Sequence, residues 1–498
     1  MNSHRMSARL GPMGAVAFPF VHQACETSGE EAKMTSKVAD ASGEDAFLPD
    51  PARDTIENPR QVPLRLQYSW GSGALGIAIL MNSIGGLILF YMVSVLQIGP
   101  ALAGTLIFVS KLLGVVTDPV VGTWSDRLRT TGSRRRPFLL WGSFACAGSF
   151  IMIFTTPMFA SEILRASYVF GALLIYTCGY ALFNVPYMSM PAEMTDSYHE
   201  RSAIHGVRMM YVAIASLVVG TISPIALEAL GRTSQFSYTV IGLCGGAIIF
   251  GATMIAYLGT RRARFTASQV ERPKILSEVG HVFSNRHFIR LLGVKATQLI
   301  GVASSQAAAM FFLLNVLQRD LTILAPAAVV GTLVQLASAP LLVRLSRKIG
   351  KSQTYIVGGC FYLLAVLSWY FASPTEPLIF YVLRMAVVSF GACANVIMAM
   401  SMLTDIISFD ALRTGVRREG VYTAFYSFTE KFTFAVGPLI VGIALSAAGF
   451  DKTLPPEAMR TPEIRQALLL GVCYIPGFLS IAAITLLAGY KLKQEDVS

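Results

Sequence analysis

The chain has 498 residues, of which 54% are hydrophobic and only 14% charged, and its formal net charge is +11. Because soluble domains carry about 25% charged residues, this composition excludes an ordinary soluble protein and indicates an integral membrane protein. The basic residues lie in short segments between long apolar runs, so they are expected to set membrane topology, and we expect no nucleic-acid partner.

The N-terminal segment, residues 1–64, has a different composition from the rest. Between Glu26 and Pro63 it is rich in Glu, Asp, Ser, Lys and Pro and poor in large apolar residues. Such a segment cannot bury enough apolar surface to offset the entropy of ordering. We therefore predict a disordered cytoplasmic extension over residues 1–64.

Apolar runs of about 20 residues, the length needed to cross a bilayer, fill most of the remaining chain. Helix is the expected form, because an isolated strand would leave backbone groups unpaired in lipid. The sequence predicts twelve spans, near 70–96, 101–124, 137–159, 166–190, 207–229, 236–258, 289–316, 322–345, 354–372, 377–407, 421–446 and 466–489.

The charge of the connecting segments predicts the orientation. The segments after the second, sixth, eighth and tenth spans are basic, which places them and both termini in the cytoplasm. A Gly-containing basic loop follows the second span as SDRLRTTGSRRRP and returns six spans later as RLSRKIGKSQT. We therefore predict two six-helix halves, 65–258 and 289–490, a cytoplasmic linker, 259–288, and a tail, 491–498. This is the layout of a major facilitator fold, in which solute sites lie between the halves at mid-membrane.

One intramembrane carboxylate stands out. Asp118, followed by Pro119, lies inside the apolar second span. A carboxylate there costs about 3 kcal/mol on insertion scales, and such residues usually mark an ion or substrate pathway. It suits binding of a cation or a proton. The alternative interpretation is a buried acid at a helix kink.

Four motifs in order give a resemblance to a known family. They are TDPVVG with SDR and RRRP, then FNVPYMSM, then ERSAIHGVRMM, and last DIISFDALRTGVRREGVYTAFYSFTEKF. Over about residues 65–490 the chain resembles the glycoside–pentoside–hexuronide:cation symporters, the branch of the major facilitator superfamily that includes melibiose permease. The resemblance implies a twelve-helix symporter without an enzymatic activity.

The resemblance assigns candidate cation-site residues. Asp118 matches the family's cation-binding carboxylate and Lys431 its span-11 lysine, with Glu430 beside it as a second proton-site candidate. The sugar-transporting members carry acids where this chain has Gly114 and Asn184, which weakens the case for Na⁺, since hard cations take several oxygen ligands. Lys431 is expected to pair with Asp118 when the cation is absent; the alternative is a static ion pair.

The resemblance also implies substrate-cavity residues. Arg208 matches an arginine at the cavity floor, with a boundary arginine as the alternative. Tyr187 and Met188 lie in the proline-containing FNVPYMSM segment. We expect its FNVPY part to break the helix and the segment to line the cavity, unless it serves helix packing alone. Ser427 shares the face of Lys431.

A set of charged residues near the predicted cytoplasmic loops resembles the superfamily's cytoplasmic gate; the alternative is a role in orientation only. Its members are Asp126, Arg127, Arg134, Arg135, Arg136, Glu200, Arg201, Asp410, Arg417, Arg418 and Glu419.

These features predict a monomeric multi-pass plasma (inner) membrane protein that carries a small solute by alternating access, coupled to H⁺ or Na⁺. The family favours a sugar or glycoside. Met188 and the missing acids favour a lipid-like or other amphipathic solute instead, and a non-transporting scaffold or receptor is a third reading. No nucleophile triad, phosphate loop or metal-ligand cluster is evident, so we expect no metal site and no cofactor besides the coupling ion.

Overall fold

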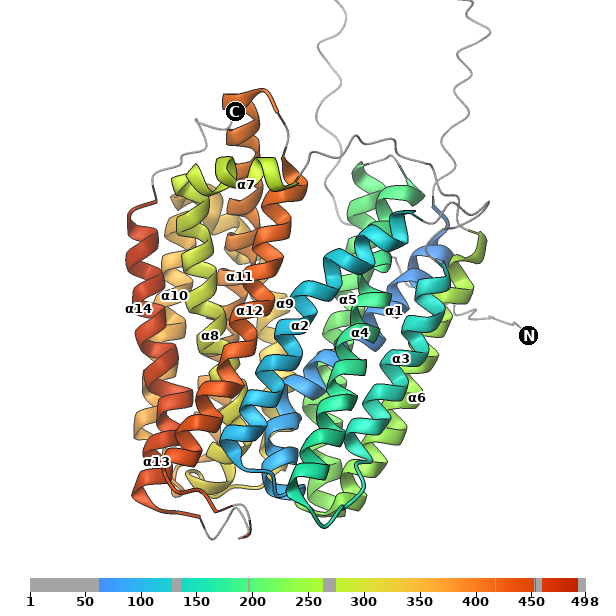
Figure 1. Cartoon of the computed structure of the whole chain (residues 1–498). Coiled ribbons are helices and arrows are strands. Elements are labelled where there is room, and N and C mark those ends of the chain that lie inside the picture. Colours follow the sequence, from blue (N-terminus) through green and yellow to red (C-terminus); the bar gives the residue numbers. More distant parts are fainter. Residues whose placement is uncertain are drawn as a thin grey trace, which may run out of the picture. The chain divides into compact units, whose positions relative to one another are not determined.

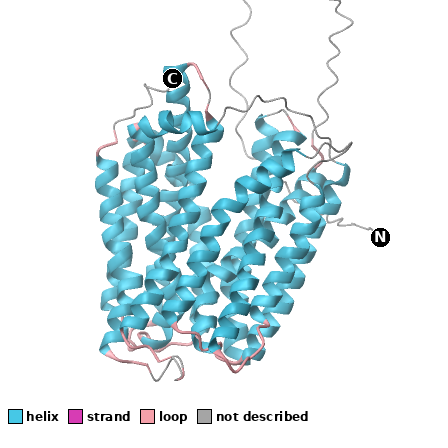
Figure 2. Cartoon of the chain, viewed as in Figure 1, coloured by secondary structure: helices cyan, strands magenta, loops and turns pink. Residues whose placement is uncertain are grey.

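The computed structural model describes residues 62–127, 136–195, 198–262, 275–416, 418–451, 453 and 459–490. The predicted disordered extension therefore lies outside the described residues except for its last three positions, and the tail 491–498 lies outside them as well. Among the described residues the secondary structure is helical, without strands (Figure 2).

The described residues contain twelve helical segments long and apolar enough to cross a membrane, which confirms the predicted number of spans. The first six are α1 with its π-helical end (Leu64–Val95), α2 (Pro100–Arg127), α3 (Arg136–Phe154), α4 (Glu162–Met194), α5 (Tyr198–Leu230) and α6 (Gln235–Gly259). The last six are α8 (Arg286–Asn315), η5 with α9 (Leu321–Ile349), α10 (Lys351–Ser368), α11 (Leu378–Thr414), α12 (Glu419–Ala447) and α13 through α14 (Pro462–Ala488).

The spans pack in two groups of six. In the first group α1 packs against α5 and α6, and α3 packs against α4 and α6; in the second, α8 packs against α12 and α14, and α10 against α11. The groups, called here the first and second halves, meet where α2 contacts α12, α5 contacts α9 and α1 contacts α8 (Figure 1).

The closest approach of α2 and α12 depends on glycine. A Cβ on Gly104 would lie 2.6 Å from the Pro438 carbonyl oxygen, and one on Gly442 would lie 2.4 Å from that of Pro100.

One local expectation about helix boundaries was wrong, and the linker shows an additional helix. The predicted break at FNVPY is absent, because α4 continues through Pro186 and Pro191 to Met194. The linker also contains a helix, α7 (Ile275–Ser284), and α8 starts inside it at Arg286. The start of α8 follows from Asn285, whose side chain accepts hydrogen bonds from the amides of His287 and Phe288, as an N-cap should.

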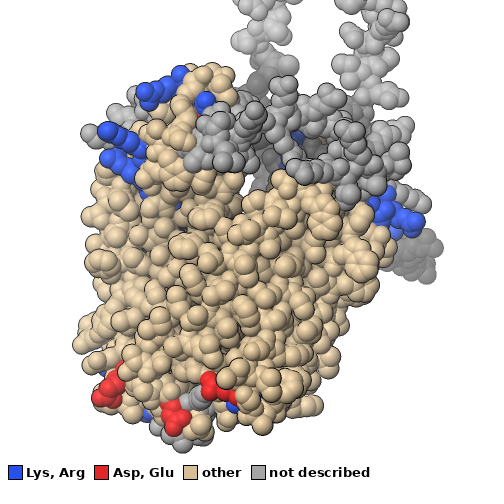
Figure 3. Space-filling model, in the orientation of Figure 1, with Lys and Arg blue, Asp and Glu red and all other residues tan. Residues whose placement is uncertain are grey.

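Charge is distributed unevenly over the surface. We call the two ends of the bundle the α7 end, where α7 lies, and the α13 end, opposite it (Figure 1). On the face seen in Figure 3, Lys and Arg gather near the α7 end and Asp and Glu near the α13 end, with an uncharged band between them. Such a band, built from twelve apolar spans, identifies a multi-pass membrane protein.

Candidate functional site

An ion pair joins the two halves deep in the apolar layer. The ammonium group of Lys431 on α12 contacts the carboxylate of Asp118 on α2. The side chains are 28% and 25% exposed, and Oδ1 of Asp118 is buried without a hydrogen-bond partner. The structure thus brings together the two residues that the sequence predicted as partners, and it leaves one carboxylate oxygen unsatisfied.

A second ion pair lies beside the first. Nζ of Lys295 on α8 is 3.0 Å from Oε1 of Glu430 and 5.3 Å from the centre of the Tyr426 ring. Lys295 is only 3% exposed, whereas the Glu430 side chain is 42% exposed. Sequence reasoning missed Lys295 because it lies near the start of its predicted span, where a lysine usually extends toward the interface. Its burial shows that it instead holds Glu430 in place.

Tyr180 on α4 lies between Asn184 and the Asp118–Lys431 pair. Nζ of Lys431 lies 5.4 Å from the centre of its ring, and its hydroxyl accepts a hydrogen bond of 3.1 Å from the Asn184 amide. Asn184, expected at the cation site, is therefore positioned next to Tyr180. The signal that could have identified Tyr180 is its spacing, since residues i and i+4 share a helix face.

The two predicted cavity residues of α4, Tyr187 and Met188, differ in burial. Tyr187 is 1% exposed and stacks on Trp70 of α1 at 4.5 Å between ring centres. Its hydroxyl donates to the Trp70 carbonyl oxygen at 3.1 Å, and the Trp70 indole donates to the Tyr187 carbonyl oxygen at 3.3 Å. These reciprocal bonds fix α1 to α4, so Tyr187 is a packing residue. Met188 is 36% exposed, and Ser427 of α12 is also exposed.

Two more cations lie within the spans. Arg208 on α5 is half-buried, and its Nε is buried without a hydrogen-bond partner. Lys111 on α2 places its ammonium group 4.6 Å from the centre of the Phe434 ring on α12. Lys111 was not predicted as a site residue, although a lysine inside an apolar run is as unusual as the aspartate that follows it.

Several predicted gate residues make contacts within one half. Arg136 lies over the Tyr257 ring, with its guanidinium 4.6 Å from the ring centre. Glu200 accepts hydrogen bonds from the Val62 amide and the Thr195 hydroxyl, and Arg201 donates to the Thr195 carbonyl oxygen at 2.9 Å.

In the second half, Arg418 pairs with Asp410 at 3.3 Å. Glu419 lies in the first turn of α12. The side chains of Asp126 and Arg127, and residues Arg134, Arg135 and Arg417, lie outside the described part of the chain.

The halves are linked at the α13 end. Arg232, just after α5, pairs with Glu228 at 2.7 Å and with Asp320 of the second half at 2.6 Å. Glu228 also accepts a hydrogen bond of 3.1 Å from the Leu321 amide of η5. Together with the glycine-mediated contact of α2 and α12, these interactions close the α13 end.

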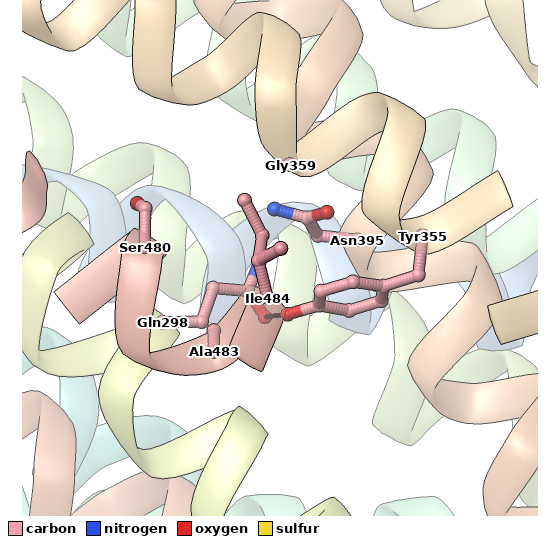
Figure 4. A pocket seen from close by; sticks show the side chains of 7 residues that line it. All are labelled: Gln298, Tyr355, Gly359, Asn395, Ser480, Ala483 and Ile484. Carbon is pink, nitrogen blue, oxygen red and sulfur yellow. Dashed lines mark hydrogen bonds between the residues drawn. The ribbon is translucent and has the colours of Figure 1, made fainter. Parts of the chain in front are cut away.

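A small polar cavity lies inside the second half. Gln298, Tyr355, Asn395 and Ser480 converge on it from α8, α10, α11 and α14 (Figure 4). The Tyr355 hydroxyl donates to Oε1 of Gln298 at 3.4 Å, and Oδ1 of Asn395 is buried without a partner. About 10 Å³ is open to the centre of a water molecule, which is room for about one water. This cavity is far too small for a sugar.

Twelve spans in two groups of six, joined at mid-membrane by an ion pair and closed at one end, define a membrane transporter of the major facilitator type. A family model described as MFS/sugar transport protein matches residues 69–494, and the chain belongs to this family.

Curated relatives and a solved structure agree with this assignment. The chain is 24% identical over 447 residues to the uncharacterized symporter YnaJ of Bacillus subtilis, covering 88% of this chain and 94% of that protein. It is 22% identical to the putative glycoside/cation symporter YagG of Escherichia coli, with the same coverage. The fold matches the crystal structure of the nucleoside transporter NupG with a TM-score of 0.59 at 14% identity, over 87% of this chain and all of that one.

Proposed function

We propose that the protein is a secondary active symporter that couples the uptake of a sugar or glycoside to a cation gradient across the plasma membrane. The family match supports a sugar, and the name of the relative YagG supports a glycoside carried with a cation. The observation that carries the coupling is the Asp118–Lys431 pair, because it joins a helix of each half at mid-membrane.

The pair supplies a mechanism for coupling. While Asp118 is ionised, its attraction to Lys431 holds α2 to α12. A cation that binds Asp118 neutralises the carboxylate and releases Lys431, so the two halves separate more easily at this level. Solute bound between the halves then shifts the population between states open to opposite sides.

The donor set favours a proton as the coupling cation. Hard metal cations take about six or more oxygen ligands. Among the described residues no group of three or more His, Cys, Asp or Glu comes together, and Asp118 contributes a single carboxylate. A single carboxylate with one unsatisfied oxygen accepts a proton without further ligands, and no other cofactor is required.

The surface charge supports an orientation for the protein. The basic α7 end faces the cytoplasm under the positive-inside rule. With the α13 end closed by Arg232, the structure then represents an inward-facing state. The predicted gate residues at the α7 end, Glu200 and Arg418 among them, form contacts across the halves in the outward-facing state.

The test is uptake by purified protein in liposomes with an imposed pH gradient or an imposed Na⁺ gradient. The assay uses a panel of radiolabelled monosaccharides, glycosides and sugar acids. We expect accumulation of at least one sugar when the pH gradient is imposed, abolished by an ionophore that collapses it. Accumulation driven by Na⁺ alone would replace the proton with Na⁺, and the absence of gradient-driven accumulation of any sugar would refute the proposed function.

A further inference from the structure

Two ion pairs lie side by side on α12. Lys431 contacts Asp118 of α2, in the first half, and its sequence neighbour Glu430 pairs with Lys295 of α8, in the same half. Lys295 lies about two and a half turns inside α8 and Glu430 about three turns inside α12, so the second pair lies within the apolar layer like the first. Charges in this layer are costly and usually serve an ion or substrate pathway. The second pair is therefore a candidate part of the coupling machinery.

The two pairs use different faces of α12. Tyr426 and Glu430 are four residues apart and share the face toward α8, where Nζ of Lys295 lies 3.0 Å from Oε1 of Glu430 and 5.3 Å from the centre of the Tyr426 ring. Lys431 is one residue further along, about 100° around the helix, and contacts α2. Side chains at adjacent helix positions do not face each other, so each pair keeps its own partner as long as both partners are present.

Lys295, more than packing, fixes the carboxylate of Glu430. The Glu430 side chain is 42% exposed, whereas Lys295 is 3% exposed. A half-exposed glutamate has room to adopt other rotamers, and the ammonium group of Lys431 on the next residue would attract its carboxylate. Lys295 has no such freedom, because a buried lysine that loses its acid is strongly unfavourable. The buried lysine therefore holds the acid, and it also cancels the charge of that acid.

We propose that Lys295 is a positioning residue for proton coupling: it holds and neutralises Glu430, so that Lys431 responds to Asp118 alone. This inference rests on the proposed proton-coupled symport. Without Lys295, the free carboxylate of Glu430 would compete with Asp118 for Lys431 and would repel the negative charge of Asp118. Both effects favour the neutral, protonated form of Asp118, because a nearby like charge disfavours the ionised form. The Asp118 carboxyl would then release its proton only at a higher pH.

The experiment follows the protonation of Asp118 directly. Infrared difference spectroscopy of the protein in liposomes records the carbonyl stretch of protonated carboxyl groups as the pH changes, and it requires no solute. The component that Asp118→Asn removes in each background identifies Asp118. Lys295→Gln should raise the midpoint of this component by roughly one pH unit, the shift produced by a unit charge on the order of 10 Å away. Lys295→Gln with Glu430→Gln removes both charges and should restore the wild-type midpoint, and Lys295→Arg should retain it.

The matched control is Lys351→Gln, which also removes a lysine from an ion pair. Lys351 is the first residue of α10, and its partner Asp405 is 27% exposed, so solvent screens the charge that is left. This variant should move the Asp118 midpoint by less than about 0.3 pH unit. The other ionisable groups on the elements around Asp118 at this depth are the same in every variant: Lys111, Tyr176, Tyr180, Arg208 and Tyr426.

Each outcome decides the inference. A wild-type midpoint in Lys295→Gln overturns it, and so does a raised midpoint that persists in the double variant, because the shift would then not depend on Glu430. If Lys295→Gln does not fold, Glu430→Gln decides: it leaves the positive charge of Lys295 without compensation and should lower the midpoint, and an unchanged or raised midpoint overturns the inference.

Uptake under an imposed pH gradient separates the inference from the proposed function. Accumulation of sugar by the wild type together with an unmoved Lys295→Gln midpoint overturns the inference alone. The expected midpoints without accumulation of any sugar would leave the role of Lys295 standing and refute sugar symport. If no component assigned to Asp118 titrates, the inference and proton coupling at Asp118 fail together.

Discussion

We expect Arg232→Gln to weaken the contact between the two halves at the α13 end by an amount that the structure allows us to calculate. The Arg232 and Glu228 side chains are 24% and 22% exposed, whereas Asp320 is 65% exposed, so solvent screens the bridge between the halves. Exposed pairs of this kind contribute about 0.2–1 kcal/mol each. Arg232→Gln removes the ion pairs with Asp320 and with Glu228, and Glu228 in turn accepts a hydrogen bond from the Leu321 amide. The state closed at the α13 end should therefore lose about 1 kcal/mol of stability relative to the state open there. That corresponds to about a fivefold shift toward the state open at this end.

The shift is measurable as a distance distribution. Spin labels at Ser161 and Thr375, both exposed on loops of the α13 end, report the separation of the halves by double electron–electron resonance in a variant without reactive native cysteines. Arg232→Gln should enlarge the long-distance population. Arg319→Gln is the control, because Arg319 donates to the Glu376 carbonyl oxygen within the second half and should leave the distribution unchanged. Identical distributions for Arg232→Gln and wild type would refute the role of this bridge.

Three further predictions follow from packing and composition. Gly104→Val should reduce uptake at least 10-fold, because the valine side chain would collide with the α12 backbone where α2 and α12 meet. The control Gly148→Ala places its methyl group in open space and should transport normally. Equal uptake by the two variants would contradict the close approach of α2 and α12. Tyr187→Phe should lower the free energy of unfolding by about 1 kcal/mol, seen as a reduced Tm, because it removes the hydrogen bond to the Trp70 carbonyl oxygen. The KM for solute should stay unchanged. A large rise in KM would instead make Tyr187 a solute ligand. Deleting Met1–Asp54 should leave uptake per inserted molecule nearly intact, and loss of uptake in protein that reaches the membrane would argue against a dispensable extension.

The spans were predictable from sequence because their signal is length and apolarity, which depend on the bilayer more than on neighbouring helices. The continuity of α4 was not predictable, since Pro186 and Pro191 lose local hydrogen bonds that tertiary packing tolerates. The helix α7 was missed because it is too short to give a spanning signal.

The same contrast holds for the site. Asp118 and Lys431 stood out as ionised groups in apolar runs, and the structure places them in contact. Lys295 and Tyr180 were not identified, because their importance lies in which helix faces them, and that depends on how the halves pack. Lys111 also lies in an apolar run, but nothing in the sequence shows that it faces Phe434 of α12. For Tyr187, the buried ring stacked on Trp70 matches the packing alternative that the sequence left open.

The coupling role of Asp118 is tested most directly by comparing accumulation with exchange for Asp118→Asn in liposomes. The amide has the shape of the protonated acid but cannot gain or lose a proton. We expect that Asp118→Asn no longer concentrates solute under an imposed pH gradient, yet still exchanges labelled for unlabelled solute. Asp405→Asn, which removes a carboxylate paired with Lys351 away from the junction of the halves, should accumulate as wild type does. Accumulation by Asp118→Asn at the wild-type level would contradict the coupling role of Asp118 and place the coupling site elsewhere, with Glu430 the next residue to test.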